Sequence, residues 1–331
     1  MSTLLEVEGV KKWFSLEKEN LFGGERQYVK AVDDISFSIN KGETLGLVGE
    51  SGCGKSTAGR TILRLIEATE GKVVLDGVNL YDLKAKELKK MRKDMQIVFQ
   101  DPYASLNPRM KVKDILEEPI KIHTNLSKKE REAKIKQVIM DVGLNAMYLE
   151  RYPHEFSGGQ RQRIGIARAL VVEPKLIIMD EPVSALDVSI QAQVLNLIQD
   201  LQEKYNLTYL FITHNLSVVK HISDRVAVMY LGRIVEISDK KSFFANPLHP
   251  YSKALISAIP ETSLVNRRER IILKGDIPSP VNPPAGCRFH TRCPFAMESC
   301  MKVEPALQKV EAGHFVACHL YEAGGETVEQ L

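Results

Sequence analysis

Residues 49–57 read Gly49-Glu50-Ser51-Gly52-Cys53-Gly54-Lys55-Ser56-Thr57, which matches the phosphate-loop pattern G-x-x-x-x-G-K-[ST] at every position. The apolar run at 43–48 predicts a buried strand before it, and residues 56–66 predict a helix after it. Glycines let successive backbone N–H groups point at a phosphate, and the helix start adds the positive end of its dipole. The alternative is a glycine-rich turn that binds nothing, but the strand–loop–helix context favours a nucleotide site.

The composition is that of a soluble globular protein. The 331 residues allow two domains, or one large domain with an appendage, and 44% are hydrophobic and 26% charged. The longest apolar runs, at 176–179 and 226–231, are far too short to span a bilayer, and the N-terminus has no signal-peptide pattern. We therefore expect a cytosolic chain that reaches a membrane only through partners. The net charge of +3 gives no argument for nucleic acid binding.

Strand-like and helical segments alternate around the loop, which predicts a mainly parallel sheet with helices on both faces. Between residues 112 and 169 the pattern is helical throughout, and Ser127 with Glu130 forms a capping box. We expect this stretch to be an inserted helical subdomain, at about 101–170. The sequence after residue 246 is rich in proline and lacks a regular hydrophobic pattern, which places a domain boundary near residue 240. The expected domains are 1–240 and a C-terminal extension, 241–331.

An apolar strand at 176–179 ends in two carboxylates, Asp180 and Glu181. A carboxylate at a strand end beside a phosphate loop can hold Mg²⁺ through its water shell, which suits Asp180. The next carboxylate can polarise a water molecule for in-line attack on a γ-phosphate, which suits Glu181. Without the phosphate loop upstream, the same pattern would indicate only a strand followed by a turn.

A second glycine-rich helix start follows Phe156 and reads Ser157-Gly158-Gly159-Gln160. Ser157 can cap the helix, and the same N–H groups can face an anion. Here the chain resembles the ATP-binding subunit of an ABC transporter, whose signature is Leu-Ser-Gly-Gly-Gln. Phe156 replaces the leucine. The resemblance implies the ABC ATPase fold with an N-terminal antiparallel β part, and a signature that acts on ATP bound by a second ATPase subunit.

The resemblance extends over nearly all of the chain. It implies a Q-loop glutamine at Gln100, a D-loop aspartate at Asp187, a switch histidine at His214, and adenine stacking on Phe14, with Trp13 as the competing candidate. The implied catalytic residues are Glu181, His214 and Gln100, and the implied Mg²⁺ ligands are Ser56, Gln100 and Asp180. The implied ATP-binding residues of the loop are Gly49, Ser51, Gly52, Cys53, Gly54, Lys55, Ser56 and Thr57.

Two further segments, 101–109 and 246–255, look like the oligopeptide/dipeptide importer subgroup. This resemblance implies a second ATPase subunit, identical or homologous, two membrane permease subunits, an extracytoplasmic substrate-binding protein acting indirectly, and a place on the cytoplasmic face of the membrane. Nickel importers share parts of these segments, so another small solute is an alternative. A soluble ABC ATPase without a transporter is a third reading, but this chain has neither two cassettes nor a long coiled-coil insertion.

Four of the five cysteines lie in the last 45 residues, with the spacing C-x₅-C-x₆-C-x₁₇-C: Cys287, Cys293, Cys300 and Cys318. In a cytosolic chain such a cluster indicates a metal more than disulfides. The spacing lacks the C-x₂-C pairs of a zinc ribbon and is not that of a ferredoxin. The resemblance implies a four-iron four-sulfur (4Fe–4S) cluster, with Zn²⁺ and reduced structural thiols as alternatives.

Overall fold

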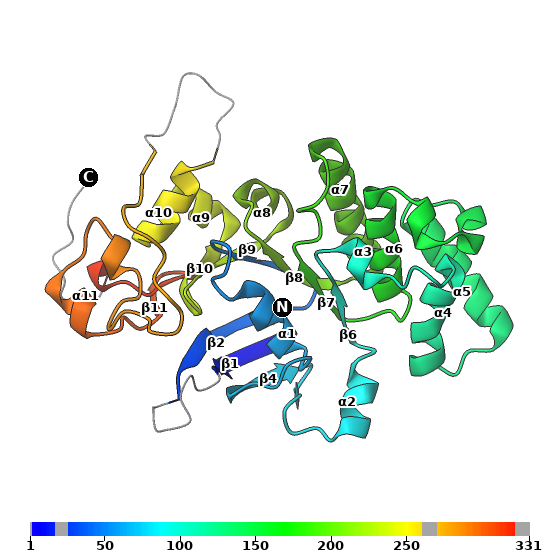
Figure 1. Ribbon diagram of the computed structural model, residues 1–331, viewed down its shortest axis with the longest axis horizontal. Helices are drawn as coiled ribbons and strands as arrows, with labels where there is room; N and C mark the ends of the chain where they lie inside the picture. Colours follow the sequence, from blue (N-terminus) through cyan, green and yellow to red (C-terminus); the bar gives the residue numbers. More distant parts are fainter. Residues whose placement is uncertain (1, 17–25, 260–269, 322–331) are drawn as a thin grey trace. The chain divides into compact units, whose positions relative to one another are not determined.

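The computed structural model describes residues 2–16, 26–259 and 270–321 (Figure 1). The chain forms two compact units. The first contains residues 1–5, 39–44 and 74–213, and the second contains residues 6–38, 45–73 and 214–331. Each unit is described below by itself.

The first unit contains three parallel strands, β6 (Met95–Val98), β7 (Leu176–Asp180) and β8 (Thr208–Thr213), in the order β6-β7-β8. Every residue of β7 and β8 is buried. Strands covered on both faces are apolar throughout, which explains the uninterrupted run predicted at 176–179. Helix α7 (Val188–Tyr205) connects β7 to β8, as a parallel pair requires.

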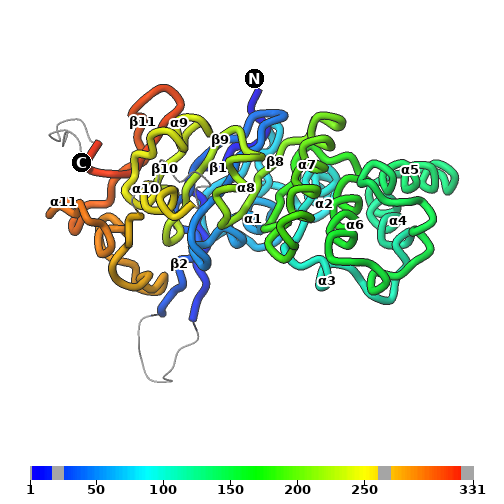
Figure 2. Tube along the Cα trace, turned by 90° about the horizontal axis from the view of Figure 1, so that it is seen from above, coloured from blue at the N-terminus to red at the C-terminus, as the bar shows by residue number. Residues whose placement is uncertain are grey.

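The predicted helical stretch also lies in the first unit. Helices α4 (Val112–His123), α5 (Lys128–Asp141) and α6 (Gly158–Leu170) pack on one another, with α3 (Pro102–Ser105) against α6 (Figures 1 and 2). The capping box predicted at Ser127 and Glu130 is confirmed, and so is the N-cap at Ser157. The remaining elements are β5 (Val78–Asn79), α2 (Ala85–Met91), η1 (Ala146–Glu150) and η2 (Pro153–Glu155).

In the second unit, β3 (Thr44–Val48) runs parallel to β9 (Arg225–Tyr230), which pairs antiparallel with β10 (Arg233–Asp239). Helix α1 (Lys55–Ile62) follows the phosphate loop, and α8 (Leu216–Ile222) precedes β9. A separate sheet orders β2 (Tyr28–Asn40), β1 (Thr3–Ser15) and β4 (Glu70–Leu75) side by side. This sheet is the predicted N-terminal β part.

The C-terminal extension folds onto the second unit and adds strands that no sequence pattern predicts. Strand β12 (His314–Val316) pairs antiparallel with β10, and β11 (Gln308–Glu311) pairs with β12. The described helical pieces of the extension are α9 (Lys240–Ala245), α10 (Pro250–Ser257), η3 (His290–Arg292), α11 (Glu298–Lys302) and η4 (His319–Tyr321). These helical pieces are only three to eight residues long, so their sequences show no clear helical periodicity.

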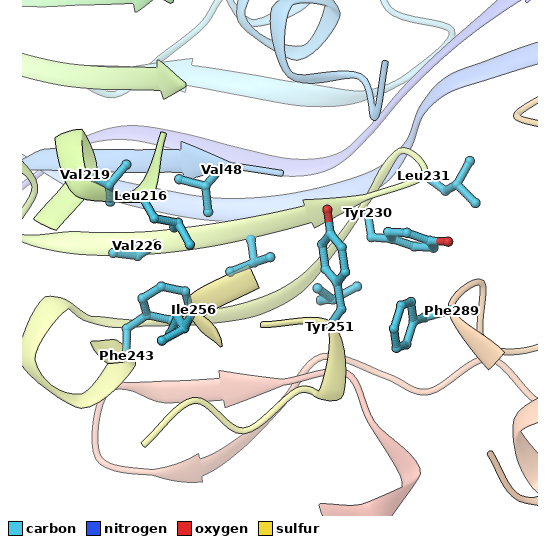
Figure 3. Packing of buried hydrophobic residues seen from close by; sticks show 12 residues of the cluster. Val48, Leu216, Val219, Val226, Tyr230, Leu231, Phe243, Tyr251, Ile256 and Phe289 are labelled. Carbon is cyan, nitrogen blue, oxygen red and sulfur yellow. The ribbon is translucent and has the colours of Figure 1, made fainter. Parts of the chain in front are cut away.

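An aromatic cluster joins the extension to this unit. Tyr230 of β9, Tyr251 of α10 and Phe289 are almost completely buried, and their rings lie at one end of the apolar core (Figure 3). The ring centroids of Tyr230 and Tyr251 are 4.7 Å apart, and those of Tyr230 and Phe289 are 5.2 Å apart in an edge-to-face arrangement. Such aromatic pairs prefer particular ring orientations, and they stabilise the fold beyond the effect of the apolar area that they bury. The segment carrying Phe289 is therefore anchored in the core.

Candidate nucleotide-binding site

The phosphate loop lies between β3 and α1, as predicted. Gly54 caps α1 in a left-handed conformation with φ 107°, and a Cβ placed there would lie 2.0 Å from the carbonyl oxygen of Ala31. Only glycine fits this position without moving the backbone. The loop residue Cys53 is buried, and its carbonyl accepts the Gly232 N–H across 2.9 Å. These contacts fix the shape of the loop against β2 and the β9–β10 turn.

Lys55 is the first residue of α1, and its side chain is 4% exposed. Its Nζ donates to the carbonyl oxygens of Gly49 and Glu50 across 2.8 and 2.9 Å. The ammonium group therefore lies over its own loop, where a phosphate would add a stronger, charged acceptor. Ser51 and Gly52 are exposed at the tip of the loop, while Ser56 and Thr57 are half-buried in the first turn of α1.

Two candidates for adenine stacking lie at the end of β1. The Trp13 indole N–H donates to Asp33 across 2.9 Å, and Lys30 Nζ lies 4.8 Å from the ring centroid. Phe14 is 38% exposed, with Lys12 Nζ 4.9 Å from its ring. Trp13 is therefore held in place on its polar edge, whereas Phe14 is the more accessible ring.

Asp33 is buried beside two arginines, the buried Arg288 and the partly exposed Arg233. Burial tends to raise the pKa of its carboxyl, but the charges of Arg288 and Arg233 outweigh this and hold the pKa below its ordinary value. Arg288 comes from the C-terminal extension and donates to Asp33. A second arginine of the extension, Arg292, pairs with Glu50 in the phosphate loop. Both contacts join residues far apart in the sequence, so local sequence patterns did not reveal them.

In the first unit, β7 carries the two predicted carboxylates to its C-terminal end. Asp180 is its last residue and is 2% exposed. Glu181 follows in the left-handed region with φ 48°, and its N–H donates to the carbonyl of Ile212 across 2.9 Å. Gln100 follows β6, and its Nε2 donates to Glu181 Oε2 across 3.0 Å. The fold therefore brings together Gln100 and Glu181, which are 81 residues apart.

The signature segment starts α6 with a complete capping box. Ser157 Oγ accepts from the Gln160 N–H across 3.4 Å, and Gln160 Oε1 accepts from the Ser157 N–H across 3.0 Å. A Cβ on Gly159 would lie 2.5 Å from Ile190 Cγ2, and one on Gly158 would lie 3.5 Å from Leu186 Cδ2. The two glycines therefore bring the signature next to residues on either side of Asp187, the N-cap of α7.

The segment after Gln100 is tied to the signature helix. Arg161 donates to the hydroxyl of Tyr103, and its guanidinium carbon lies 3.4 Å from the centroid of the same ring. Arg168 donates to the carbonyl of Ser105. Tyr103 is nevertheless 62% exposed, so it offers an aromatic surface beside α6.

The predicted site residues are divided between the two units. The first unit contains Gln100, Asp180, Glu181, Asp187 and the signature residues Ser157, Gly158, Gly159 and Gln160. The second contains the phosphate loop, Phe14, His214 and the four clustered cysteines. His214 is exposed and lies directly before Asn215, the N-cap of α8.

The four cysteines of the extension are free thiols. Burial raises the pKa of Cys318 to about 12, and the charges of Cys287, Cys293 and Cys300 act in the same direction. Among residues 2–16, 26–259 and 270–321, no group of three or more His, Cys, Asp or Glu side chains is arranged to hold a metal ion.

Two family models match the chain. The model described as "ABC transporter" matches residues 32–184, and the one described as "Oligopeptide/dipeptide transporter, C-terminal region" matches residues 235–300. Together with the phosphate loop, these matches define the chain as an ABC-type ATPase, so the predicted α/β cassette fold is confirmed. None of the helices in the described part of the chain combines the length and hydropathy of a membrane span.

Relatives and solved structures agree with this class. The chain is 56% identical over 322 residues to the oligopeptide transport ATP-binding protein AppF of Bacillus subtilis, covering 96% of this chain and 98% of the relative. It is 52% identical over 315 residues to the dipeptide transport ATP-binding protein DppF of Haemophilus influenzae, covering 95% and 96%. The chain belongs to the family of oligopeptide and dipeptide transport ATP-binding proteins.

Two solved cassettes share the fold. The ATP-binding cassette MJ0796, in a dimeric post-hydrolysis state bound to ADP and Pi, superposes with a TM-score of 0.63 at 29% identity, covering 72% of this chain and 99% of that one. The cbiO1 protein from Clostridium perfringens, part of the ABC transporter complex cbiONQ, gives 0.63 at 27% identity, covering 74% and 92%.

Proposed function

We propose that this chain lies on the cytoplasmic face of a membrane, where it hydrolyses ATP to drive the import of oligopeptides or dipeptides. The observation that carries this proposal is the joint occurrence of a complete phosphate loop with the peptide-transporter C-terminal region in one chain. Relatives named for oligopeptide and dipeptide transport, which match over nearly the whole length, support the peptide class of substrate.

In this mechanism, the N–H groups of residues 51–57 and the Lys55 ammonium bind the β- and γ-phosphates. Water attacks the γ-phosphorus in line with the β–γ bridging oxygen. The bond between that oxygen and the γ-phosphorus breaks, and ADP leaves with the oxygen. Glu181 accepts the proton of the attacking water, and Gln100 orients the Glu181 carboxylate through its hydrogen bond. His214 contacts the γ-phosphate and completes the set of catalytic residues.

Ser56 and Asp180 supply a hydroxyl and a carboxylate, the hard oxygen donors that Mg²⁺ prefers. We assign them, with Gln100, to the Mg²⁺ that accompanies ATP; the ion supplies charge neutralisation of the phosphates. Their oxygen and amide chemistry fits this role, and Asp180 is buried at a strand end, so its carboxylate is fixed in place.

The signature requires a second ATPase subunit in this mechanism. Ser157 and the N–H groups at the start of α6 act on ATP bound by the partner subunit, and Asp187 contributes to the interface between the two. ATP binding closes the pair and hydrolysis reopens it. Two permease subunits dock beside Gln100, where exposed Tyr103 lies against α6, and a substrate-binding protein outside the membrane delivers the peptide.

The four thiols Cys287, Cys293, Cys300 and Cys318 are assigned to a 4Fe–4S cluster. The spacing of the four cysteines and the match to the peptide-transporter C-terminal region support this assignment, with Zn²⁺ as the alternative. Iron, sulfide and zinc analysis of anaerobically purified protein tests this assignment. About four irons per chain support the cluster, and one zinc or no metal rejects it.

Uptake by a strain that lacks this chain tests the transport function. We expect the strain to lose uptake of labelled tetrapeptide or dipeptide, and wild-type chain to restore it, while Lys55→Ala does not. Loss of nickel uptake with intact peptide uptake would support the nickel alternative instead. Unchanged uptake of both would favour a soluble ABC ATPase.

A further inference from the structure

Two arginines of the extension reach residues beside the phosphate loop. We propose that Arg292 and Arg288 are positioning residues for ATP, because Arg292 neutralises Glu50 within the phosphate loop and Arg288 fixes Asp33, which holds Trp13. This inference rests on the proposed function of the loop and assigns the extension a part in it. The two residues lie in one short segment, between Cys287 and Cys293.

Arg292 and Glu50 form a two-pronged ion pair. The Nη1 and Nη2 atoms of Arg292 donate to the two carboxylate oxygens of Glu50 across 2.8 and 3.3 Å. The arginine side chain is 9% exposed and the glutamate 26% exposed. The backbone N–H of Glu50 donates to the Tyr251 hydroxyl across 2.9 Å, so the extension binds this residue at two points. A guanidinium that donates to both oxygens of a carboxylate fixes the orientation of the carboxylate and also neutralises its charge.

The position of Glu50 gives this pair a consequence for ATP. Glu50 is the second residue of the phosphate loop, so its carboxylate brings a negative charge next to an anion-binding site. The guanidinium of Arg292 cancels that charge. Without Arg292, the carboxylate would repel the phosphates, and the repulsion would weaken as salt screens it. Arg292 therefore raises ATP affinity without touching the nucleotide.

Arg288 pairs with Asp33, the carboxylate that accepts the indole N–H of Trp13. It donates to Asp33 and to the carbonyl of Leu231, and the other carboxylate oxygen of Asp33 accepts the indole N–H of Trp13 across 2.9 Å. Asp33 is 3% exposed. Because a buried carboxylate needs partners, removing Arg288 would leave Asp33 undercompensated and release the constraint on Trp13.

The segment that carries both arginines is held firmly. Phe289 is 1% exposed, and its ring centroid lies 5.4 Å from that of Tyr251 and 5.2 Å from that of Tyr230 (Figure 3). The Cys287 N–H donates to the Cys300 carbonyl across 2.8 Å. A rigid base of this kind keeps the guanidinium groups where the loop and Asp33 require them.

ATP titrations and steady-state ATPase kinetics on the full chain test the role of Arg292. We expect Arg292→Gln to weaken ATP binding about three- to tenfold at low salt, with a smaller loss at high salt and a nearly unchanged kcat. Arg292→Lys should recover part of the affinity. The double variant Glu50→Gln/Arg292→Gln, which has neither charge, should return to within about twofold of wild type. Lys302→Gln, which removes an exposed ion pair of the same extension, is the matched control.

The outcomes separate this inference from the proposed function. Equal loss of affinity in Arg292→Gln and the double variant would make Arg292 a general structural residue and overturn the inference. Unchanged affinity in Arg292→Gln would overturn it too. A wild-type chain that does not bind ATP would instead reject the function proposed for the loop.

Trp13 is the single tryptophan of the chain, so its fluorescence reports on Arg288 directly. We expect Arg288→Gln to shift Trp13 emission and to weaken ATP binding, whereas Lys302→Gln changes neither. Asp33→Asn should shift the emission similarly, because it removes the buried charge that Arg288 partners. Emission and affinity identical to wild type in Arg288→Gln would overturn the role of Arg288.

Discussion

The Gln100 amide donates a hydrogen bond to the Glu181 carboxylate across 3.0 Å, joining the second residue after β6 to the first residue after β7. The two strands pair in parallel, with Val98 opposite Met179, so their carboxyl ends meet at one edge of the sheet. Glu181 adopts φ 48°, a conformation that non-glycine residues rarely take. Such local strain at the end of a buried strand is typical of residues placed for function.

Gln100→Glu should disturb the candidate base. The introduced carboxylate would repel the Glu181 carboxylate instead of donating a hydrogen bond to it. We expect about tenfold lower turnover of ATP hydrolysis at neutral pH, a larger loss than in the uncharged control Gln100→Ala. Equal turnover in the two variants would show that charge beside Glu181 does not affect the candidate base.

Lys55→Gln should abolish nucleotide binding. The Lys55 ammonium is buried and bound to two loop carbonyls, so the variant loses the loop's only side-chain cation and its hold on Gly49. Isothermal titration with ATP should show at least a hundredfold weaker binding, about 3 kcal/mol. Lys72→Gln, which breaks an exposed pair with Glu8, should bind ATP as the wild type does.

Gly159→Ala and Gly165→Ala form a matched pair within α6. A methyl group on Gly159 would lie 2.5 Å from Ile190 Cγ2, whereas one on Gly165 meets nothing within 4 Å outside the helix's own backbone. We expect Gly159→Ala to shift the signature relative to α7 and lower ATPase turnover severalfold. Gly165→Ala should keep its activity and gain about 0.5–1 kcal/mol of stability from helix propensity. Equal activities would mean that the close contact at Gly159 is not required.

His249 should make the protein sensitive to acid. Burial lowers its pKa from 6.5 to about 4, against the opposing effect of the Glu236 carboxylate. Below pH 6.5, His249 binds a proton in the unfolded chain but stays neutral in the folded chain. The free energy of unfolding therefore falls as the pH drops toward 4. The loss by pH 5 should be about 2 kcal/mol.

A His249→Asn variant isolates this effect. In the wild type, Nδ1 of His249 accepts the Tyr251 N–H across 3.0 Å at the start of α10. The side-chain oxygen of asparagine can accept the same hydrogen bond, and asparagine does not titrate. Urea unfolding at pH 7 and at pH 5 should show a smaller loss of stability in the variant. An equal loss would mean that other groups, such as Glu236 with its partner His314, cause the acid sensitivity.

The fold and much of the candidate site could be predicted because their signals are contiguous. The phosphate loop, the apolar strand ending at Asp180, and the Ser157 capping box each occupy one short stretch of sequence. The pairing of Arg292 with Glu50 could not be predicted, since 242 residues separate them and neither lies in a pattern that requires the other. Strand β12 was also missed, because three residues show no periodicity.

In the proposed mechanism the chain hydrolyses ATP through Glu181, and one comparison tests this role most directly. ATP binding and phosphate release would be measured on wild type and Glu181→Gln, with Glu173→Gln as an exposed control. We predict unchanged ATP affinity in Glu181→Gln and at least a hundredfold slower phosphate release. Normal phosphate release by Glu181→Gln would contradict the role of Glu181 and the mechanism built on it.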